Sequence, residues 1–386
     1  MSLNFPLPQG HAAGGERLRI AVLSHLHHPV SSPFLGGLEM HTSLMADEFA
    51  SRGHDVTLFA KAGSVSGGRV VEVLAEDFEF RRGLAPEEMH RQQQTLDAAL
   101  GSAIAAVRDG GFDVVVNNSL SLLPYLRLAD QPMLTILHTP PLPWILDAVE
   151  DGRAPLSPLH RFVSVSARNT TGWSTHLPDL HVIHNGIRLA DWPAGTGRRT
   201  GTAVWAGRVT PEKGLHIAID AARMAGMELH FAGPISDARY FDRTVAPHLG
   251  RGVQHVGHLD HRDLADFLGS GDVFIASPVW SEPFGLTALE AMACGTPVAA
   301  LPLGAMPEII DADGGRLAEG LGADALAAAV TAARVLDRDR VRKSAARFSA
   351  AAMVDAYEDQ VRSLLDPDGL PSTRPDAGRP GAALVP

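Results

Sequence analysis

The chain has 386 residues, and because hydrophobic cores stop growing near roughly 250–300 residues, this length disfavours a single core and favours two domains. The formal net charge of −11 argues against nucleic acid and anionic membranes as partners, since both attract a basic face. A single cysteine, Cys294, excludes an internal disulfide, and no apolar run reaches the roughly eighteen residues of a membrane span. We therefore expect a soluble, cytoplasmic protein with no integral membrane segment.

Short β-branched runs alternate with longer helical stretches, which is typical of parallel sheets with helices on both faces. In the first half, we expect strands at 18–24, 54–60, 112–117, 133–138, 161–164 and 181–184, and helices at 37–52 and 86–109. In the second half, we expect strands at 202–206, 227–232, 252–256, 272–276 and 297–300, and helices at 215–225, 237–249, 260–268 and 285–293. The repeated alternation predicts an α/β fold of two Rossmann-like, doubly wound domains that face each other across a cleft.

The first predicted helix is amphipathic. Leu38, Met45 and Phe49 recur at helical spacing, so we expect that face to lie on the sheet.

Turn-forming residues separate the two series. The dipeptide Asn185-Gly186 and the segment 193–199 are typical of turns and linkers, since glycine adopts backbone conformations that other residues resist. We assign residues 18–185 to an N-terminal domain and 200–348 to a C-terminal domain, with flexible ends at 1–17 and 367–386. Ligands of such sheets bind at the carboxyl ends of the strands, so the cleft between the domains is the expected site.

Two acids, Glu282 and Glu290, flank the start of a predicted helix. Their spacing puts Glu282 in the loop before the helix and Glu290 inside it. Between them, the free backbone amides of Phe284, Gly285 and Leu286 form an anion site that the helix dipole reinforces, and a diphosphate between two polyhydroxyl groups would fit there. The alternative is a pair of ordinary surface glutamates, but apolar neighbours surround Glu290, and an unpartnered buried charge is costly.

A second group of charges follows the first strand of the C-terminal domain, where Arg208 and Lys213 bracket a turn that begins at Gly207. Arginine offers a planar fork for phosphate oxygens and lysine a mobile point charge, so the pair could neutralise a departing diphosphate. The alternative is a helix-capping turn in which Lys213 pairs with Glu212 or with solvent.

Together, these segments resemble the retaining nucleotide-sugar glycosyltransferases of the GT-B fold, specifically family four. The resemblance rests on the Gly-Arg-x-x-x-x-Lys-Gly run at 207–214 and on the two glutamates of 282–290, in the same order and separation. It extends over most of residues 18–366 and includes Gly-Gly-Leu-Glu at 36–39 and His-Asn-Gly-Ile at 184–187.

The resemblance implies a role for each residue that matches the family pattern. Arg208 and Lys213 would bind the donor diphosphate, Glu282 the hydroxyls of the donor sugar, and Glu290 the ribose. His138 matches the histidine that family members place beside the transferred sugar, although a lone histidine is otherwise more often structural. We therefore count Arg208, Lys213, His138 and Glu282 as catalytic residues.

Backbone groups are implied as further donor contacts. Gly36 and Gly37 would let the chain approach the phosphates at a helix start, although two glycines alone could be a tight turn. The strand end at Gly257, His258 and Leu259 would receive the nucleobase.

Two features of the C-terminal half bear on the resemblance. A C-terminal helix at 350–366 is implied to pack back on the first domain. At 304–308 the chain reads Gly-Ala-Met-Pro-Glu where many relatives have two glycines, which leaves details of the donor-sugar pocket open.

A histidine cluster, His25, His27 and His28, follows the first strand. Imidazoles are common metal ligands, but no second ligand set stands at recognisable spacing, so we expect no metal and assign the cluster to the acceptor side.

We thus predict metal-independent transfer of a hexosyl group, with retention, from a UDP- or GDP-sugar to a hydroxyl of a small-molecule or sugar acceptor. The nucleotide sugar is a cosubstrate, and no cofactor is expected. A sugar-nucleotide epimerase, a phosphorylase of the same fold, and a non-catalytic nucleotide-sugar-binding protein remain alternatives. The sequence leaves the donor sugar, the acceptor and the oligomeric state open.

Overall fold

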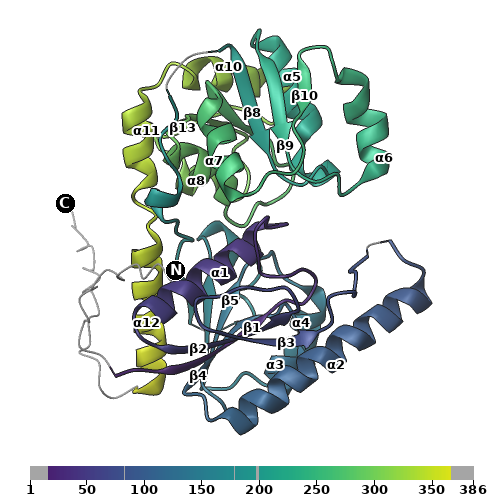
Figure 1. Ribbon diagram of the computed structural model, residues 1–386, viewed down its shortest axis with the longest axis vertical. Coiled ribbons are helices and arrows are strands. Elements are labelled where there is room, and N and C mark those ends of the chain that lie inside the picture. Colours follow the sequence, from purple (N-terminus) through teal and green to yellow (C-terminus); the bar gives the residue numbers. More distant parts are fainter. Residues whose placement is uncertain (1–15, 82, 178, 197–199, 367–386) are drawn as a thin grey trace, which may run out of the picture.

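The computed structural model describes residues 16–81, 83–177, 179–196 and 200–366, and they form two α/β lobes (Figure 1). The predicted flexible ends at 1–17 and 367–386 fall almost entirely outside these residues, as does part of the predicted linker. Both lobes contain a parallel sheet, so the predicted α/β class with two doubly wound domains is confirmed.

The N-terminal sheet has seven strands in the order β3-β2-β1-β4-β5-β6-β7. Its strands are β1 (Arg19–Ser24), β2 (Asp55–Lys61), β3 (Arg69–Leu74), β4 (Val114–Asn118), β5 (Met133–Leu137), β6 (His160–Ser164) and β7 (Leu180–Val182). Its helices are α1 (Gly37–Ser51), α2 (Pro86–Gly110), α3 (Leu123–Arg127) and α4 (Pro143–Glu150), followed by the short 3₁₀ turns η1 (Arg168–Thr170) and η2 (Leu189–Asp191).

The C-terminal sheet has six strands in the order β10-β9-β8-β11-β12-β13. Its strands are β8 (Thr202–Ala206), β9 (Glu228–Ala232), β10 (Val253–His255), β11 (Val273–Ala276), β12 (Val298–Ala300) and β13 (Gly315–Leu317). The helical elements are η3 (Pro211–Lys213), α5 (Leu215–Met224), α6 (Ala238–Tyr240), η4 (Phe241–Val245), η5 (Ala246–His248), α7 (His261–Ser270), α8 (Leu286–Ala293), α9 (Met306–Ile309), α10 (Ala323–Ala333), α11 (Arg338–Ala345) and α12 (Ala350–Leu365).

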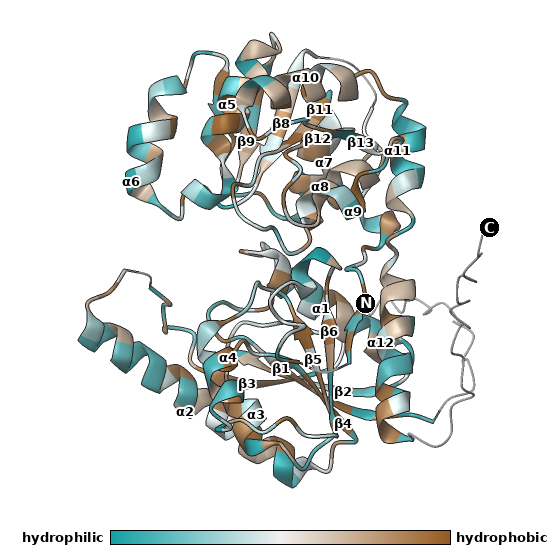
Figure 2. Ribbon diagram, turned by 180° about the vertical axis from the view of Figure 1, so that it is seen from behind, coloured by the Kyte–Doolittle hydropathy of each residue, from teal (hydrophilic) through white to brown (hydrophobic). Residues whose placement is uncertain are grey.

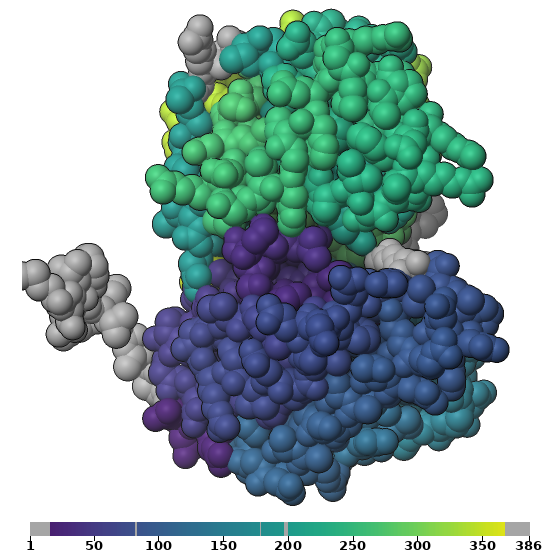
Figure 3. Space-filling view, turned by 45° about the vertical axis from the view of Figure 1, so that its right-hand side comes forward, coloured from purple at the N-terminus to yellow at the C-terminus, as the bar shows by residue number. Residues whose placement is uncertain are grey.

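The strand order reverses direction once in each sheet, next to β1 in the first and next to β8 in the second. A crevice opens at such a reversal, outside the carboxyl ends of the strands. The segments that follow β1 and β8 begin at His25 and Gly207, and both lie at the boundary between the lobes. Figure 3 shows early residues of the chain, in purple, reaching into this boundary.

The core consists of apolar strands covered on both faces, as Figure 2 shows by the hydrophobic colour of the strands and the hydrophilic outer faces of the helices. The buried face of α1 includes Met45 and Phe49, which are fully buried. Leu38 was predicted on that face, but it is half-buried and lines the cleft, because the first turn of α1 lies close to Leu286 of the other domain.

One predicted helix is broken. The segment expected as a helix at 237–249 divides into α6, the π-helical η4 and the 3₁₀ turn η5. Pro247 lacks the N–H that would continue the α-helical hydrogen bonds, and its ring crowds the preceding turn. The strands β3 and β13 and the helices α3, α4, α9, α10 and α11 were also not predicted.

The last helix, α12, returns to the N-terminal domain and packs on α1 and β6. Its Tyr357 is fully buried, and the hydroxyl of Tyr357 lies 3.1 Å from Nε2 of His41 on α1. No helix among the described residues is long and apolar enough to cross a membrane.

Candidate active site

A cavity of about 410 Å³ lies between the two domains. Nearly all of the predicted site residues line it. Those from the N-terminal domain are His25, His27, His28, Gly36, Gly37 and His138, and those from the C-terminal domain are Gly207, Arg208, Lys213, His258, Leu259, Glu282, Phe284, Gly285, Leu286 and Glu290. Gly257 does not line the cavity. Its carbonyl oxygen instead accepts a hydrogen bond from the amide of Gly233, 2.8 Å away, which joins the ends of β9 and β10.

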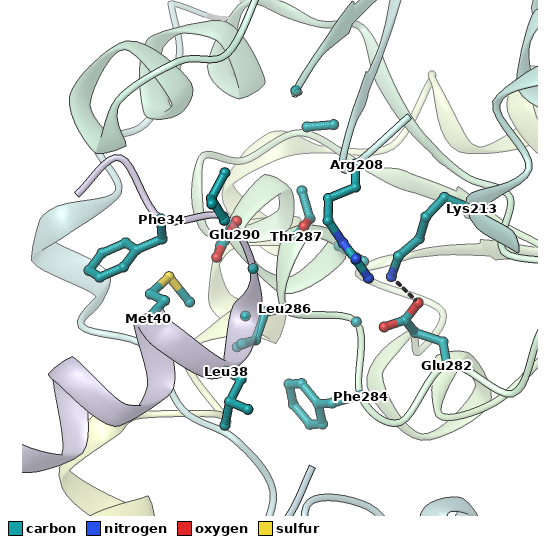
Figure 4. A pocket seen from close by; sticks show the side chains of 18 of the residues that line it. Phe34, Leu38, Met40, Arg208, Lys213, Glu282, Phe284, Leu286, Thr287 and Glu290 are labelled. Carbon is teal, nitrogen blue, oxygen red and sulfur yellow. Dashed lines mark hydrogen bonds and ion pairs between the residues drawn. The ribbon is translucent and has the colours of Figure 1, made fainter. Parts of the chain in front are cut away.

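The two predicted diphosphate ligands lie on the same side of the cavity as Glu282. In Figure 4, the side chains of Arg208 and Lys213 run alongside each other toward Glu282, whereas Glu290 lies on the far side of Thr287 from Lys213. Nζ of Lys213 donates to Oε2 of Glu282 over 2.6 Å. The alternative pairing of Lys213 with Glu212 is therefore wrong.

Trp280 completes this group. Its Nε1–H donates to the same Oε2 of Glu282 over 2.9 Å, and the ammonium of Lys213 lies 5.1 Å from the centroid of the indole ring. A cation above an indole is attracted to the negative face of the ring. Trp280 was not predicted as a site residue. Only its position two residues before Glu282 could have indicated it from the sequence.

The loop that carries Lys213 is held by a close backbone approach. Gly214 ends η3 with φ of 67°, and a Cβ atom there would overlap the carbonyl oxygen of Ser277. The hydroxyl of Ser277 in turn donates to the carbonyl of Gly214 over 2.9 Å. Only glycine allows this contact, which fixes the turn before α5 against the end of β11.

Glu290 lies inside α8 and is 4% exposed, so it is not a solvated surface acid. Burial raises the pKa of Glu290 to about 8. No hydrogen bond or ion pair holds its carboxyl group within the described part of the chain, although the residue lines the cavity. A ligand that brought hydroxyl donors to this carboxyl would lower its pKa and satisfy it.

Both halves of the chain match known families, residues 35–191 the Glycosyltransferase Family 4 and residues 200–334 the Glycosyl transferases group 1. The chain belongs to the GT-B glycosyltransferases of family four. A glycogen synthase of Mycobacterium tuberculosis is 29% identical over 338 residues, covering 76% of this chain and 80% of that protein. A D-inositol 3-phosphate glycosyltransferase of Mycolicibacterium smegmatis is 29% identical, covering 94% and 95% of the two chains. The crystal structure of Anabaena Alr3699/HepE in complex with UDP-glucose superposes with a TM-score of 0.68 at 16% identity, covering 90% of this chain and 100% of that chain.

His138 of this glycosyltransferase is kept neutral. Burial and the neighbouring His41 hold its pKa well below the usual range, and its ring contacts that of His41 edge-on at 4.5 Å. Nε2 of His138 lies 3.1 Å from Oδ1 of Asn118, whose Nδ2 donates to the hydroxyl of Thr42. This arrangement assigns the proton to Nε2 and leaves Nδ1 of His138 as an acceptor.

The histidine cluster of the glycosyltransferase does not converge on one point. Nε2 of His25 lies 3.4 Å from a carboxylate oxygen of Glu39, with both side chains buried. Burial alone would raise the pKa of Glu39, but the contact with His25 and the charge interactions with His25 and His28 leave that pKa lowered. The ring of His27 stacks on Phe80 with 3.7 Å between centroids, and burial is the main cause of a lowered pKa at His28. No three metal-ligating side chains come together among the residues described.

Proposed function

We propose that this glycosyltransferase moves a hexosyl group from a UDP- or GDP-linked sugar to a hydroxyl of a small-molecule or sugar acceptor, with retention and without a metal ion. The observation that carries the proposal is one cavity in which two cations, Arg208 and Lys213, lie with the carboxyls of Glu282 and Glu290 at separate places (Figure 4). A diphosphate flanked by two polyhydroxyl groups has the complementary pattern of charge and hydrogen-bond donors.

Each end of such a donor has a matching partner. Oε1 of Glu282, which has no hydrogen-bond partner among the described residues, can accept from hydroxyls of the sugar, and the buried carboxyl of Glu290 can accept from the ribose. The residues that precede α8, and Gly36 and Gly37 at the start of α1, also line the cavity, so their backbone amides are candidate donors to the phosphates. The neutral His138 offers Nδ1 to a sugar hydroxyl from the acceptor domain.

The names of similar proteins support this range of substrates. The Anabaena structure holds UDP-glucose, and the Mycolicibacterium smegmatis relative is named for an inositol phosphate acceptor, which is a small polyol. These names favour a nucleotide-diphosphate sugar as donor and a small hydroxylated molecule as acceptor.

In the proposed reaction the acceptor hydroxyl attacks the anomeric carbon from the face that the diphosphate leaves. The bond from the anomeric carbon to the phosphate oxygen breaks, the bond to the acceptor oxygen forms, and the departing phosphate oxygen takes the acceptor proton. Arg208, Lys213 and the amides of 284–286 stabilise the charge that develops on the leaving group. These fixed cations supply charge that a divalent metal would otherwise provide.

The test has two stages. A panel of nucleotide sugars is screened by thermal shift, because a ligand that binds the native state raises its melting temperature. The sugar that binds is then incubated with polyol and sugar acceptors in the presence of EDTA, and the anomeric configuration of the product is read by NMR. Inverted product, or transfer abolished by EDTA, would contradict the proposal.

The same assay separates the alternatives. An epimerase converts the nucleotide sugar without an acceptor, a phosphorylase requires free phosphate, and a binding protein shows a thermal shift without turnover.

A further inference from the structure

The turn after β6 in the N-terminal domain is bound to the C-terminal domain at two places. The hydroxyl of Ser166 donates to the carbonyl oxygen of Pro283 over 2.6 Å. The amides of Ala167 and Arg168 donate to the two carboxylate oxygens of Glu308, over 2.8 and 2.6 Å. Glu308 lies on α9, 140 or more residues from this turn in the sequence.

A third group from the N-terminal domain reaches the same carboxylate. Nε2 of His184, at the start of the domain junction, lies 3.0 Å from Oε2 of Glu308. Hydrogen bonds to an ionised carboxylate are roughly twice as strong as neutral ones, and the side chain of Glu308 is only 22% exposed. Glu308 therefore makes the main polar contact between this turn and the C-terminal domain.

The segment that carries Glu308 is bound in turn to Glu282. The amide of Ala305 donates to the carbonyl oxygen of Glu282 over 2.9 Å. Gly304 has φ of 58°, and a Cβ atom there would overlap the backbone of Glu282. Because Ser166 holds the next residue, Pro283, the turn after β6 contacts the backbone around Glu282 both directly and through Glu308.

We propose that Glu308 is a positioning residue that fixes the donor-sugar loop, with Glu282, against the acceptor domain, so that the bound sugar meets the acceptor hydroxyl rather than water. The inference rests on the proposed transferase function. It assigns Glu308 no contact with the nucleotide, since Glu308 does not line the cavity that holds Arg208, Lys213 and Glu290.

The experiment compares full-length Glu308→Ala and Glu308→Gln with the wild type. Glutamine keeps one acceptor oxygen but places an NH₂ group against one of the amides, so it should retain only part of the effect. Glu319→Gln is the matched control, because Glu319 is exposed on the same domain and lies outside the cavity. Three quantities are measured: the kcat of transfer, the fraction of donor hydrolysed instead of transferred, and the Kd of UDP or GDP, whichever stabilises the wild type.

We expect Glu308→Ala to lower kcat of transfer by about tenfold to a hundredfold, the loss associated with charge-assisted hydrogen bonds, and Glu308→Gln by less. The hydrolysed fraction should rise in both variants, while the nucleotide Kd stays within about twofold, because the diphosphate and ribose ligands are untouched. A purely structural role would lower the melting temperature without changing the ratio of hydrolysis to transfer.

Ser166→Ala provides a second route if Glu308→Ala folds poorly, since it leaves Glu308 in place and removes the bond to Pro283 together with one from the amide of Asn169 inside the same turn. It should also raise the hydrolysed fraction, and its effect should be less than additive with that of Glu308→Gln, because both act on one loop. The proposal is overturned if the hydrolysed fraction of donor is unchanged in both Ser166→Ala and Glu308→Gln. It is also overturned if the nucleotide Kd rises by the same factor by which kcat falls.

Small-angle scattering distinguishes this failure from failure of the proposed function. If the wild type transfers no nucleotide sugar, the transferase proposal fails. The contacts of Glu308 between the domains still predict a larger radius of gyration for Glu308→Ala than for Glu319→Gln. Equal radii of gyration would show that Glu308 does not hold the two domains together.

Discussion

Trp280 donates its indole N–H to Glu282 on the oxygen that also holds the ammonium of Lys213. Oε2 of Glu282 thus has two donors, at 2.9 and 2.6 Å, and Oε1 has none among the residues that the structure describes. Two donors on one oxygen fix the orientation of the carboxyl before any ligand binds. The free oxygen is then available to a sugar hydroxyl.

Trp280→Phe tests the indole donor. Phenylalanine keeps an aromatic ring near Lys213 but loses the N–H, so we expect kcat/KM for the nucleotide sugar to fall by about tenfold, the effect of one hydrogen bond to a charged group. Steady-state kinetics measures this effect. Trp144→Phe is the control, because Trp144 is 53% exposed and does not line the cavity. An equal loss in both variants would show that the indole N–H has no special role.

Arg208→Ala and Lys213→Ala test the cations that face the leaving group. Removing one donor that stabilises charge in a transition state lowers kcat by about a hundredfold to a thousandfold. We expect this loss in both variants with little change in melting temperature, since neither side chain belongs to a hydrophobic core. Lys343→Ala, an exposed lysine on α11, is the control. Wild-type turnover in both site variants would refute the assignment.

Glu290→Gln tests the buried carboxyl through the pH dependence of stability. The pKa of Glu290 is raised to about 8 in the native protein, whereas a glutamate in an unfolded chain titrates near about 4.3. Between these values the unfolded state has lost the proton that the native state keeps. This group therefore makes the free energy of unfolding decrease as pH rises, by up to roughly 1.4 kcal/mol per pH unit.

Urea denaturation of wild type and Glu290→Gln at pH 5, 6.5 and 8 measures the effect. Other titrating groups are common to both proteins, so their contributions cancel in the difference. The variant should gain stability relative to the wild type as pH rises. Parallel stability curves would mean that Glu290 is ionised in the native protein across this range.

Tyr357→Phe tests how α12 is held on the N-terminal domain. The substitution removes the hydroxyl that pairs with Nε2 of His41 and leaves that buried nitrogen without a partner. We expect a loss of about 1–3 kcal/mol in the free energy of unfolding, the cost of an unsatisfied buried polar group. Urea denaturation of the wild type and of Tyr357→Phe measures it. A loss below about 0.5 kcal/mol would show that water or a rearranged side chain replaces the bond.

Local patterns in the sequence were sufficient for most strands and helices near the site. β8 begins and ends where its apolar run does, at 202–206, and α8 follows the acid and glycine that precede it. Such elements are specified by residues a few positions apart. The broken helix at 237–249 shows the limit, because one proline outweighed an otherwise helical pattern.

The sequence by itself determined the class of fold, the family, and the residues that gather at the carboxyl ends of the strands, because hydrophobic periodicity and motif spacing are local properties. Only the tertiary structure decided which of these residues touch. The pairing of Lys213 with Glu282 spans 69 residues, and Glu308 reaches amides 140 and 141 residues away. Those contacts depend on how two sheets face each other, which no pattern within either segment encodes.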